Sequence, residues 1–202
     1  MTQDTVFRLI IFVVVVVSLA ISIHYRRKAN RASSERISRR EEGVPLLVLL
    51  RLAGLSVWLS LLTYLINPAW VAWAALALPL ELRWLGAGFS LTALPLVFWM
   101  FHSLGHNVTD TVAIRQRHTL VMHGPYRWIR HPLYSFGSLL FVGIGLMAAN
   151  GLLLATMGIA FPLLVIRTPI EEAKLIEHFG NEYRAYMQQT GRFLPRLTRP
   201  TS

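Results

Sequence analysis

The chain has 202 residues, of which 54% are hydrophobic, a formal net charge of +10 at pH 7 and no cysteine. One small soluble core cannot bury so much apolar surface, so lipid must cover part of it, and the length suits one compact bundle of transmembrane helices. The lack of cysteine excludes disulfides, thiolate nucleophiles and cysteine-ligated metals. The positive charge does not indicate nucleic-acid binding, because no nucleic-acid motif is present and the basic residues gather between and after the apolar runs.

Two apolar runs in the first third of the chain predict two membrane-spanning helices. Residues 6–25 are about long enough to cross the hydrocarbon core, and the charges follow this run, which favours a retained span over a cleaved signal peptide. Residues 26–42 are polar and basic, so we expect a cytoplasmic loop here and the N-terminus outside. A second span is predicted over residues 44–66, ending at Asn67-Pro68.

The middle of the chain predicts a third span between two shorter segments. Residues 68–79 are apolar but too short to cross alone, so we expect an interfacial or re-entrant piece, with a full crossing as the alternative. Residues 84–104 are long enough to span, and packed membrane helices tolerate a proline such as Pro95. Residues 105–128 turn polar and basic and are predicted to be cytoplasmic.

The second half predicts a helical hairpin and a polar tail. Residues 133–166 are apolar, with the turn-forming Asn150-Gly151 at their middle, and the basic tail from Arg167 onward puts both hairpin ends in the cytoplasm. Residues 171–187 have helical spacing broken at Gly180, which predicts a short amphipathic helix pair, although their composition alone fits an interfacial anchor. The predicted fold is all-α: a polytopic integral membrane bundle of about five transmembrane helices with a cytosolic C-terminal helical segment.

Three polar clusters lie at the predicted membrane edge, where ionisable groups are costly unless they have a partner or a role. They are His118-Thr119-Leu120-Val121, the stretch from Gly124-Pro125-Tyr126-Arg127 to Arg130-His131-Pro132-Leu133-Tyr134, and Arg167 with Glu171 and Glu172. Each has an ordinary explanation. His118 fits an exposed loop, and Arg130 and His131 fit a headgroup-contacting loop before a helix that begins at Pro132. Glu171 and Glu172 fit a helix N-terminus just after Pro169.

Taken in order, these clusters resemble the isoprenylcysteine carboxyl methyltransferase family. The matching string is His118 to Val121, Gly124-Pro125-Tyr126, Arg130 to Tyr134, a hairpin, Arg167, Glu171-Glu172, Phe179-Gly180, Tyr183 and Tyr186. It spans about half the chain, from roughly residue 104 to 195, whereas the N-terminal half matches only as generic spans. The resemblance implies S-adenosylmethionine as cofactor, in a pocket on the cytosolic side that opens to the bilayer. A Rossmann-type site has no support, since no strand leads into a glycine-rich turn and helix.

The resemblance also implies roles for individual residues. Cofactor contacts would come from His118, Thr119, Leu120, Val121, Tyr126, His131, Pro132, Leu133, Tyr134 and Glu171, and no metal is implied. Arg167 matches the arginine that the family places beside the acceptor carboxylate. Residues 1–104 would then be an N-terminal transmembrane part and residues 105–202 a catalytic region. The two parts together would form one structural domain. Pro169-Ile170 departs from a more acidic family pattern, so the resemblance does not define the role of Glu172.

The expected activity is carboxyl O-methylation of a prenylcysteine-like or other lipid-like acceptor. A carboxylate is already ionised at neutral pH, so the site needs no general base and must only align the acceptor, for which an arginine is suited. A phospholipid N-methyltransferase is the alternative enzyme, although an amine acceptor would first have to lose a proton. A non-catalytic or sterol-reductase-like membrane protein is the alternative of another class. The expected partners are a prenylated acceptor and membrane lipids, and the oligomeric state is not defined.

Overall fold

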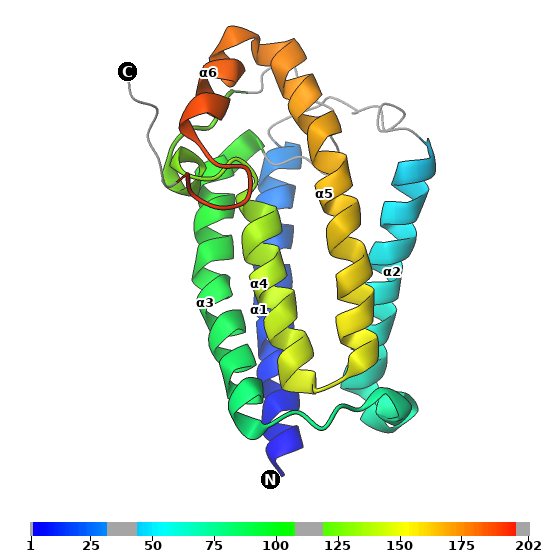
Figure 1. Cartoon of the computed structure of the whole chain (residues 1–202). Helices are drawn as coiled ribbons and strands as arrows, with labels where there is room; N and C mark the ends of the chain where they lie inside the picture. The colour runs from blue at the N-terminus through cyan, green and yellow to red at the C-terminus, as the bar shows by residue number, and fades with distance from the viewer. Residues whose placement is uncertain (1, 32–43, 108–118, 197–202) are drawn as a thin grey trace.

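The computed structural model describes residues 2–31, 44–107 and 119–196, and five long helices form its bundle (Figure 1). These helices are α1 (Gln3–Arg31), α2 (Val44–Ile66), α3 (Leu80–Leu104), α4 (Pro132–Ala148) and α5 (Gly151–Phe179). A short α6 (Asn181–Gln189) and the 3-10 turns η2 (Pro68–Ala74), η3 (Gly105–Asn107) and η4 (Gly124–Arg127) complete the elements. The predicted all-α membrane bundle is confirmed, and the chain is a multi-pass membrane protein.

The apolar runs form helices because a helix satisfies all of its backbone hydrogen bonds internally, as the bilayer interior requires. Of the helices in the described residues, α1, α2, α3 and α5 are long and apolar enough to cross a membrane. The fifth, α4, is apolar but has 17 residues, which gives a length of about 26 Å and lies at the short end of the spanning range. Residues 68–74 form η2, a 3-10 turn that begins at the predicted Asn67-Pro68 break.

The two ends of the bundle carry different segments (Figure 1). One end, called the loop end here, carries the end of α1, the beginning of α2, the connection from α3 to α4, and α6. The opposite end, called the turn end, carries the N-terminus, η2 and the tight connection from α4 to α5. The described parts of the three segments predicted to share one side of the membrane therefore lie together at the loop end.

The hairpin turns where the sequence predicts. Helix α4 ends as Ala149 takes a left-handed conformation with φ of 46°. The Asn150 side chain then caps α5, because its Oδ1 accepts from the backbone N–H groups of Leu152 and Leu153 at 3.1 and 3.3 Å. Its amide nitrogen donates to the Val71 carbonyl at 2.9 Å, which ties the hairpin to η2.

Helix α5 corrects one explanation for the acidic pair. No new helix begins at Glu171 or Glu172, because α5 runs without a break through Pro162 and Pro169 to Phe179. Glu171 and Glu172 therefore lie inside a long helix, and placement at a helix N-terminus does not explain them. The predicted amphipathic pair is the last part of α5 followed by α6, and the break between them falls at Gly180, whose φ is 57°.

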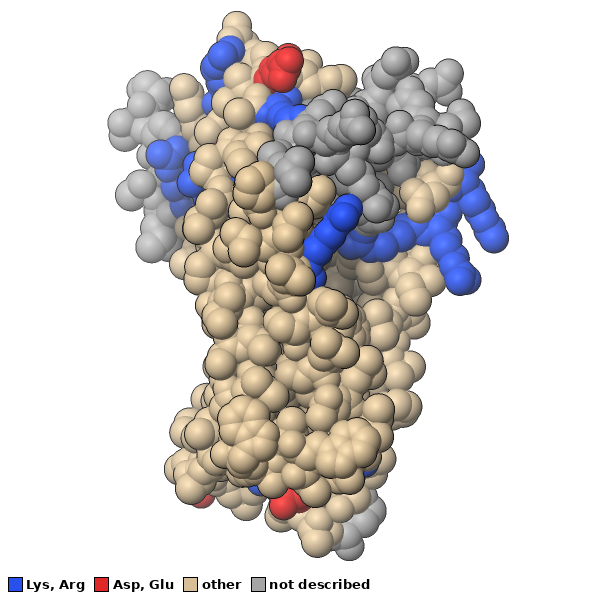
Figure 2. All heavy atoms as spheres, turned by 90° about the vertical axis from the view of Figure 1, so that its right-hand side faces the viewer, with Lys and Arg blue, Asp and Glu red and all other residues tan. Residues whose placement is uncertain are grey.

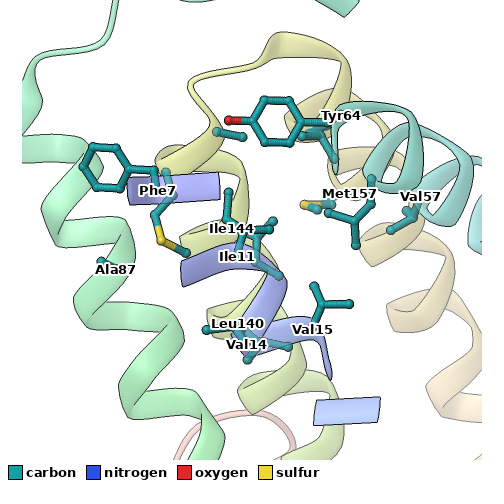
Figure 3. Close-up of a cluster of buried hydrophobic side chains, with 14 of the residues drawn as sticks. Phe7, Ile11, Val14, Val15, Val57, Tyr64, Ala87, Leu140, Ile144 and Met157 are labelled. Carbon is teal, nitrogen blue, oxygen red and sulfur yellow. The ribbon is translucent and has the colours of Figure 1, made fainter. Parts of the chain in front are cut away.

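The largest hydrophobic cluster lies in the half of the bundle toward the turn end, and all five long helices contribute to it (Figure 3). Within this half, α3 and α4 approach closely through small residues. A Cβ on Gly143 would lie only 2.5 Å from the Gly86 carbonyl oxygen, and the Ser90 hydroxyl donates to the Leu140 carbonyl at 3.0 Å. Such contacts between small residues are typical of membrane helix packing.

A second, smaller cluster lies toward the loop end, and its buried members come from α1 and α3 alone. They are Tyr25, Ala29, Val97, Met100 and Phe101. On the face shown in Figure 2, charged side chains lie toward the two ends, with Lys and Arg most plentiful toward the loop end, and the middle of the bundle shows none. This distribution fits a lipid-facing belt between two polar edges.

Candidate functional site

The loop before α4 is held by the C-terminal segment through backbone pairing. The N–H groups of Arg130 and His131 donate to the carbonyls of Gly191 and Arg192 at 2.9 and 3.0 Å. The Gly191 N–H donates in return to the Trp128 carbonyl at 3.0 Å. Helix α4 then begins at Pro132, as the sequence predicts. Two segments that are about 60 residues apart in the chain therefore meet at the loop end.

Glu172 is the centre of the polar contacts at this end. Its Oε1 accepts from Nε of Arg130 at 2.9 Å and lies 3.3 Å from Nε2 of His131. Its Oε2 accepts from Arg192 at 2.6 Å. The Glu172 side chain is 4% exposed and that of Arg130 is 8% exposed, so these charges are buried and depend on one another. One carboxylate of α5 thereby joins the loop before α4 to the C-terminal segment.

Arg130 uses its remaining donors inside the protein. Its Nη1 donates to the Met187 carbonyl at 3.1 Å and also to the Thr190 carbonyl. A headgroup-contacting role does not explain this residue, because its guanidinium is buried among protein acceptors. The end of α6 is therefore fixed to the same ion pair that holds Glu172.

Glu171, the neighbour of Glu172, is placed differently. Its Oε2 accepts a hydrogen bond of 2.8 Å from the Tyr134 hydroxyl and lies 4.0 Å from Nδ1 of His131. The Glu171 side chain is 30% exposed, so much of its capacity to accept hydrogen bonds is available to a ligand. The adjacent carboxylates thus differ in their surroundings. Glu172 is buried and joins the loop before α4 to the C-terminal segment, whereas Glu171 is partly exposed.

Aromatic rings frame the exposed carboxylate. The rings of His131 and Tyr134 stack with centroids 5.6 Å apart and an interplanar angle of 5°. The Phe193 ring packs against both, at centroid distances of 6.1 and 6.3 Å. The Ser135 hydroxyl donates to the Phe193 carbonyl and fixes this part of the C-terminal segment.

Tyr126 in η4 lies at the edge of the same group. Its carbonyl accepts a 2.6 Å hydrogen bond from the Tyr186 hydroxyl, which fixes α6 against η4. Burial, with smaller contributions from Tyr186 and from the charge of Glu171, raises the pKa of the Tyr126 phenol far above its usual value. The phenol therefore stays neutral at physiological pH and can act as a hydrogen-bond donor.

The strip before η4 is held by a separate contact. The Asn107 side chain donates to the Thr119 hydroxyl at 3.0 Å and accepts from the Thr119 N–H at 3.2 Å. Leu120 is half-buried and Val121 is buried. No hydrogen bond joins these three residues to the group around Glu171 within the described parts of the chain. His118, the first predicted contact, lies outside the described residues.

The remaining predicted residues fall on α4 and α5. Pro132 is buried at the first turn of α4, whereas Leu133 is exposed on the outside of the bundle. Arg167 lies four residues before Glu171 on α5, so the two side chains share one face of the helix about 6 Å apart along its axis. The structure therefore brings His131, Tyr134 and Glu171 into contact and puts Arg167 one turn closer to the membrane interior.

Sequence reasoning did not assign the residues that hold this site together. Glu172 and Arg130 stood in the polar clusters without a role, and the opposite signs of their charges were the one signal that they pair. Arg192 and Thr190 carried no signal, because their contribution depends on how the C-terminal segment folds back. Among the described residues, no group of three or more His, Asp or Glu side chains is arranged to hold a metal ion.

The fold and the contacts at the loop end define a multi-pass membrane protein with a buried cluster of polar side chains at that end. Residues 82–182, half of the chain, match the family described as phospholipid methyltransferase, and the chain belongs to that family. The matched region contains most of α3, the loop before α4, the hairpin and the acidic pair of α5.

Curated relatives match parts of the chain that are each shorter than half of it. The cobalt-zinc-cadmium resistance protein CzcN of Cupriavidus metallidurans is 37% identical over 87 residues, which are 42% of this chain and 39% of that protein. A protein-S-isoprenylcysteine O-methyltransferase of Tribolium castaneum is 35% identical over 39% of this chain and 28% of its own length. The matches thus cover less than half of these relatives.

A solved structure has a similar fold. It is the eukaryotic intramembrane Ras methyltransferase ICMT, an isoprenylcysteine carboxyl methyltransferase, with a TM-score of 0.51 and 24% identity. The alignment covers 76% of this chain and 53% of that one. The family resemblance inferred from the order of the motifs is confirmed by these matches together.

Proposed function

We propose that this protein is a membrane methyltransferase that uses S-adenosylmethionine and methylates the carboxylate of a prenylcysteine-like or other lipid-like acceptor. The observation that carries the proposal is the convergence of His131, Tyr134 and Glu171 at one end of the bundle, within the half of the chain that matches the family. Relatives named as protein-S-isoprenylcysteine O-methyltransferases support the acceptor class.

The residues present suit the proposed cofactor, which carries hydroxyl groups, an ammonium and a sulfonium cation. The partly exposed Glu171 carboxylate would accept from such donors, since Tyr134 uses only part of its hydrogen-bonding capacity. The rings of His131, Tyr134 and Phe193 offer faces for adenine or for a cation. Further contacts would come from Thr119, Leu120 and Val121 in the strip before η4 and from Tyr126 in η4. Pro132 and Leu133 in the first turn of α4 would complete them. When bound, S-adenosylmethionine supplies an electrophilic methyl group.

The chain's own part in the reaction is orientation. Arg167 would hold the acceptor carboxylate by two parallel hydrogen bonds and so aim one of its oxygens, which is a proximity effect. No residue has to remove a proton from an acceptor that is already ionised. Glu172, Arg130 and Arg192 would act indirectly, since they keep His131 and the C-terminal segment in place.

Methylation of a phospholipid amine is the second candidate, favoured by the description of the matching family. Arg167 opposes it, because a guanidinium one turn below Glu171 would repel an ammonium headgroup. An amine would also need a base to take its proton. Comparing methyl transfer to a prenylcysteine analogue with transfer to phosphatidylethanolamine separates the two reactions.

We also propose that the loop end faces the cytoplasm. The end of α1 carries Arg26, Arg27, Lys28 and Arg31, and the described tail carries Arg184, Arg192 and Arg196, which follows the positive-inside bias. A reporter fused to the C-terminus should give a cytoplasmic signal. An external signal would reverse the orientation of the site.

Binding and transfer test the proposed function in sequence. The purified chain should bind S-adenosylmethionine and its demethylated product, and Glu171→Gln should bind both more weakly, whereas Glu177→Gln on the exposed part of α5 should bind normally. Methyl transfer to a prenylcysteine analogue should then exceed transfer to phosphatidylethanolamine. A parent protein that binds neither nucleoside would refute the methyltransferase proposal, and the reverse acceptor preference would refute the carboxylate.

A further inference from the structure

A cavity of about 460 Å³ lies against the last three turns of α1, and none of its residues belongs to the site around Glu172. Its lining residues are Ala20, Ile23, His24, Arg27, Lys28 and Arg31. They recur at intervals of three and four positions, so they form one face of the helix. The described wall of the cavity is therefore a single stripe of α1 at the loop end.

The stripe changes character along the helix. Ala20 and Ile23 are apolar and lie toward the middle of the span, whereas the cationic side chains follow toward Arg31, the last residue of α1. The axial distance from the level of Ile23 to that of Arg31 is about 12 Å, at 1.5 Å per residue. The wall thus offers an apolar surface below and positive charge above, in the order that the acyl and headgroup regions of a leaflet have.

The cations of the stripe are paired with no acidic side chain that the structure describes. Arg27, Lys28 and Arg31 form no ion pair with any Asp or Glu in the part of the chain that the structure describes. The opposite face of α1 packs against the rest of the protein, because Tyr25 and Ala29 are buried and the Tyr25 hydroxyl lies 3.2 Å from Nδ1 of His102. Among the described residues, no carboxylate therefore competes with a ligand for the charge of the stripe.

We propose that this cavity binds one anionic phospholipid, whose phosphate contacts Arg27, Lys28 and Arg31. Cationic side chains at the membrane surface attract anionic headgroups, and a guanidinium suits the geometry of a phosphate. Free phosphate would use the cations alone and leave Ala20 and Ile23 bare, whereas a phospholipid covers both parts of the wall. The site is independent of the proposed methyl transfer.

Native mass spectrometry of the full chain in detergent tests the assignment. Dioleoyl-phosphatidylglycerol should form a one-to-one adduct at concentrations at which dioleoyl-phosphatidylcholine does not. The double variant Arg27→Gln/Arg31→Gln should lower the apparent affinity for phosphatidylglycerol on the order of tenfold, since each cation near the surface contributes to the attraction. Arg27→Lys/Arg31→Lys keeps the charge and should retain most of the adduct.

A matched control removes equal charge elsewhere at the same end. Arg184→Gln/Arg196→Gln changes two exposed cations on and after α6 and should bind phosphatidylglycerol like the parent. The proposal is overturned if this control loses as much affinity as the α1 variant, or if both lipids bind the parent equally. Displacement of the lipid by an equal concentration of inorganic phosphate would instead assign a free-phosphate site. If circular dichroism shows that the double variant is unfolded, Lys28→Gln carries the test, with a loss of about threefold expected.

Discussion

Arginines fix both ends of the bundle, but they bind different partners at each. At the turn end, Arg8 donates to the carbonyls of Leu65 and Ile66, both at 3.0 Å, and so satisfies the last residues of α2. At the loop end, Arg130 and Arg192 instead converge on the buried carboxylate of Glu172. Carbonyl capping stabilises a helix that is already formed, whereas convergence on one carboxylate positions segments that have no regular structure of their own.

The packing of the two ends differs in the same way. All five long helices share the hydrophobic cluster toward the turn end, but the buried members of the cluster toward the loop end come from α1 and α3. The only buried residues of α5 beyond Met157 are polar, namely Thr168 and Glu172. The loop end therefore depends on polar contacts for its order, which leads us to expect that changes there affect ligand binding and that changes at the turn end affect stability alone.

The largest effect is expected from Glu172→Gln. The substitution removes the negative charge beside Arg130, which is 8% exposed and cannot turn to water, whereas Arg192 is 42% exposed and can. Breaking a buried ion pair from one side costs about 3–5 kcal/mol of stability. We expect a clear drop in the thermal unfolding temperature in detergent, together with loss of S-adenosylmethionine binding as His131 loses its partner.

Glu177→Gln is the matched control for this prediction, since Glu177 is exposed on the same helix. It should unfold and bind like the parent. Parental unfolding and parental binding in Glu172→Gln would show that the loop end does not depend on this carboxylate.

Arg167→Lys should have the next largest effect, and it should act on turnover. If Arg167 only extends toward lipid phosphates, Lys should replace it almost without loss, because a flexible point charge does this equally well. If it grips the acceptor carboxylate, Lys cannot reproduce the planar two-point contact. We expect methyl transfer to a carboxylate acceptor to fall at least about tenfold, equivalent to about 1.5–3 kcal/mol, with unchanged cofactor affinity.

The exposed Arg51 of α2 gives the control for this change. Arg51→Lys should leave transfer unaffected. Near-parental turnover in Arg167→Lys would show that Arg167 does not bind the acceptor carboxylate. It would not affect the proposal that S-adenosylmethionine binds beside Glu171.

These predictions depend on contacts that the sequence could indicate only in part. Hydrophobic runs determine where helices cross a bilayer, so the end of α2 at Ile66 and the reversal at Asn150 were predictable. The continuity of α5 through Pro169 was not, because a proline that usually ends a helix is tolerated within a packed bundle.

The candidate site was likewise predictable only in part. Motif order indicated which segments belong together, and the contact between Tyr134 and Glu171 agrees with that order. The role of Glu172 required knowledge of where the C-terminal segment returns, since Arg192 reaches it only through backbone pairing with the loop before α4. Local sequence carries no information about such a return, because the pairing partners are far apart in the chain.

At the turn end, Arg83→Met should lower stability and spare ligand binding. Arg83 donates to the Met147 carbonyl at 3.0 Å near the end of α4, and its guanidinium lies 4.4 Å from the centre of the Phe7 ring. Met retains much of the packing but leaves the carbonyl without this donor, for which we expect a loss of about 1–2 kcal/mol. Thermal unfolding should detect it, and S-adenosylmethionine titration should give the parental dissociation constant. Weaker cofactor binding in this variant would show that the two ends are coupled.

The smallest effect is expected from Asp4→Asn, which separates the two contributions of Arg83. Oδ1 of Asp4 lies 2.7 Å from Nη1 of Arg83. The Asp4 side chain is nevertheless 77% exposed, so water and salt screen the pair. An exposed ion pair of this kind contributes little, and we expect the free energy of unfolding to change by less than about 0.5 kcal/mol. Arg83 would keep its hydrogen bond to Met147 and its contact with Phe7, because neither depends on Asp4. Unfolding of Asp4→Asn and Arg83→Met under one set of conditions is the measurement. A loss in Asp4→Asn as large as that in Arg83→Met would assign the stabilising role of Arg83 to the ion pair, and the turn end would then depend on paired charges as the loop end does.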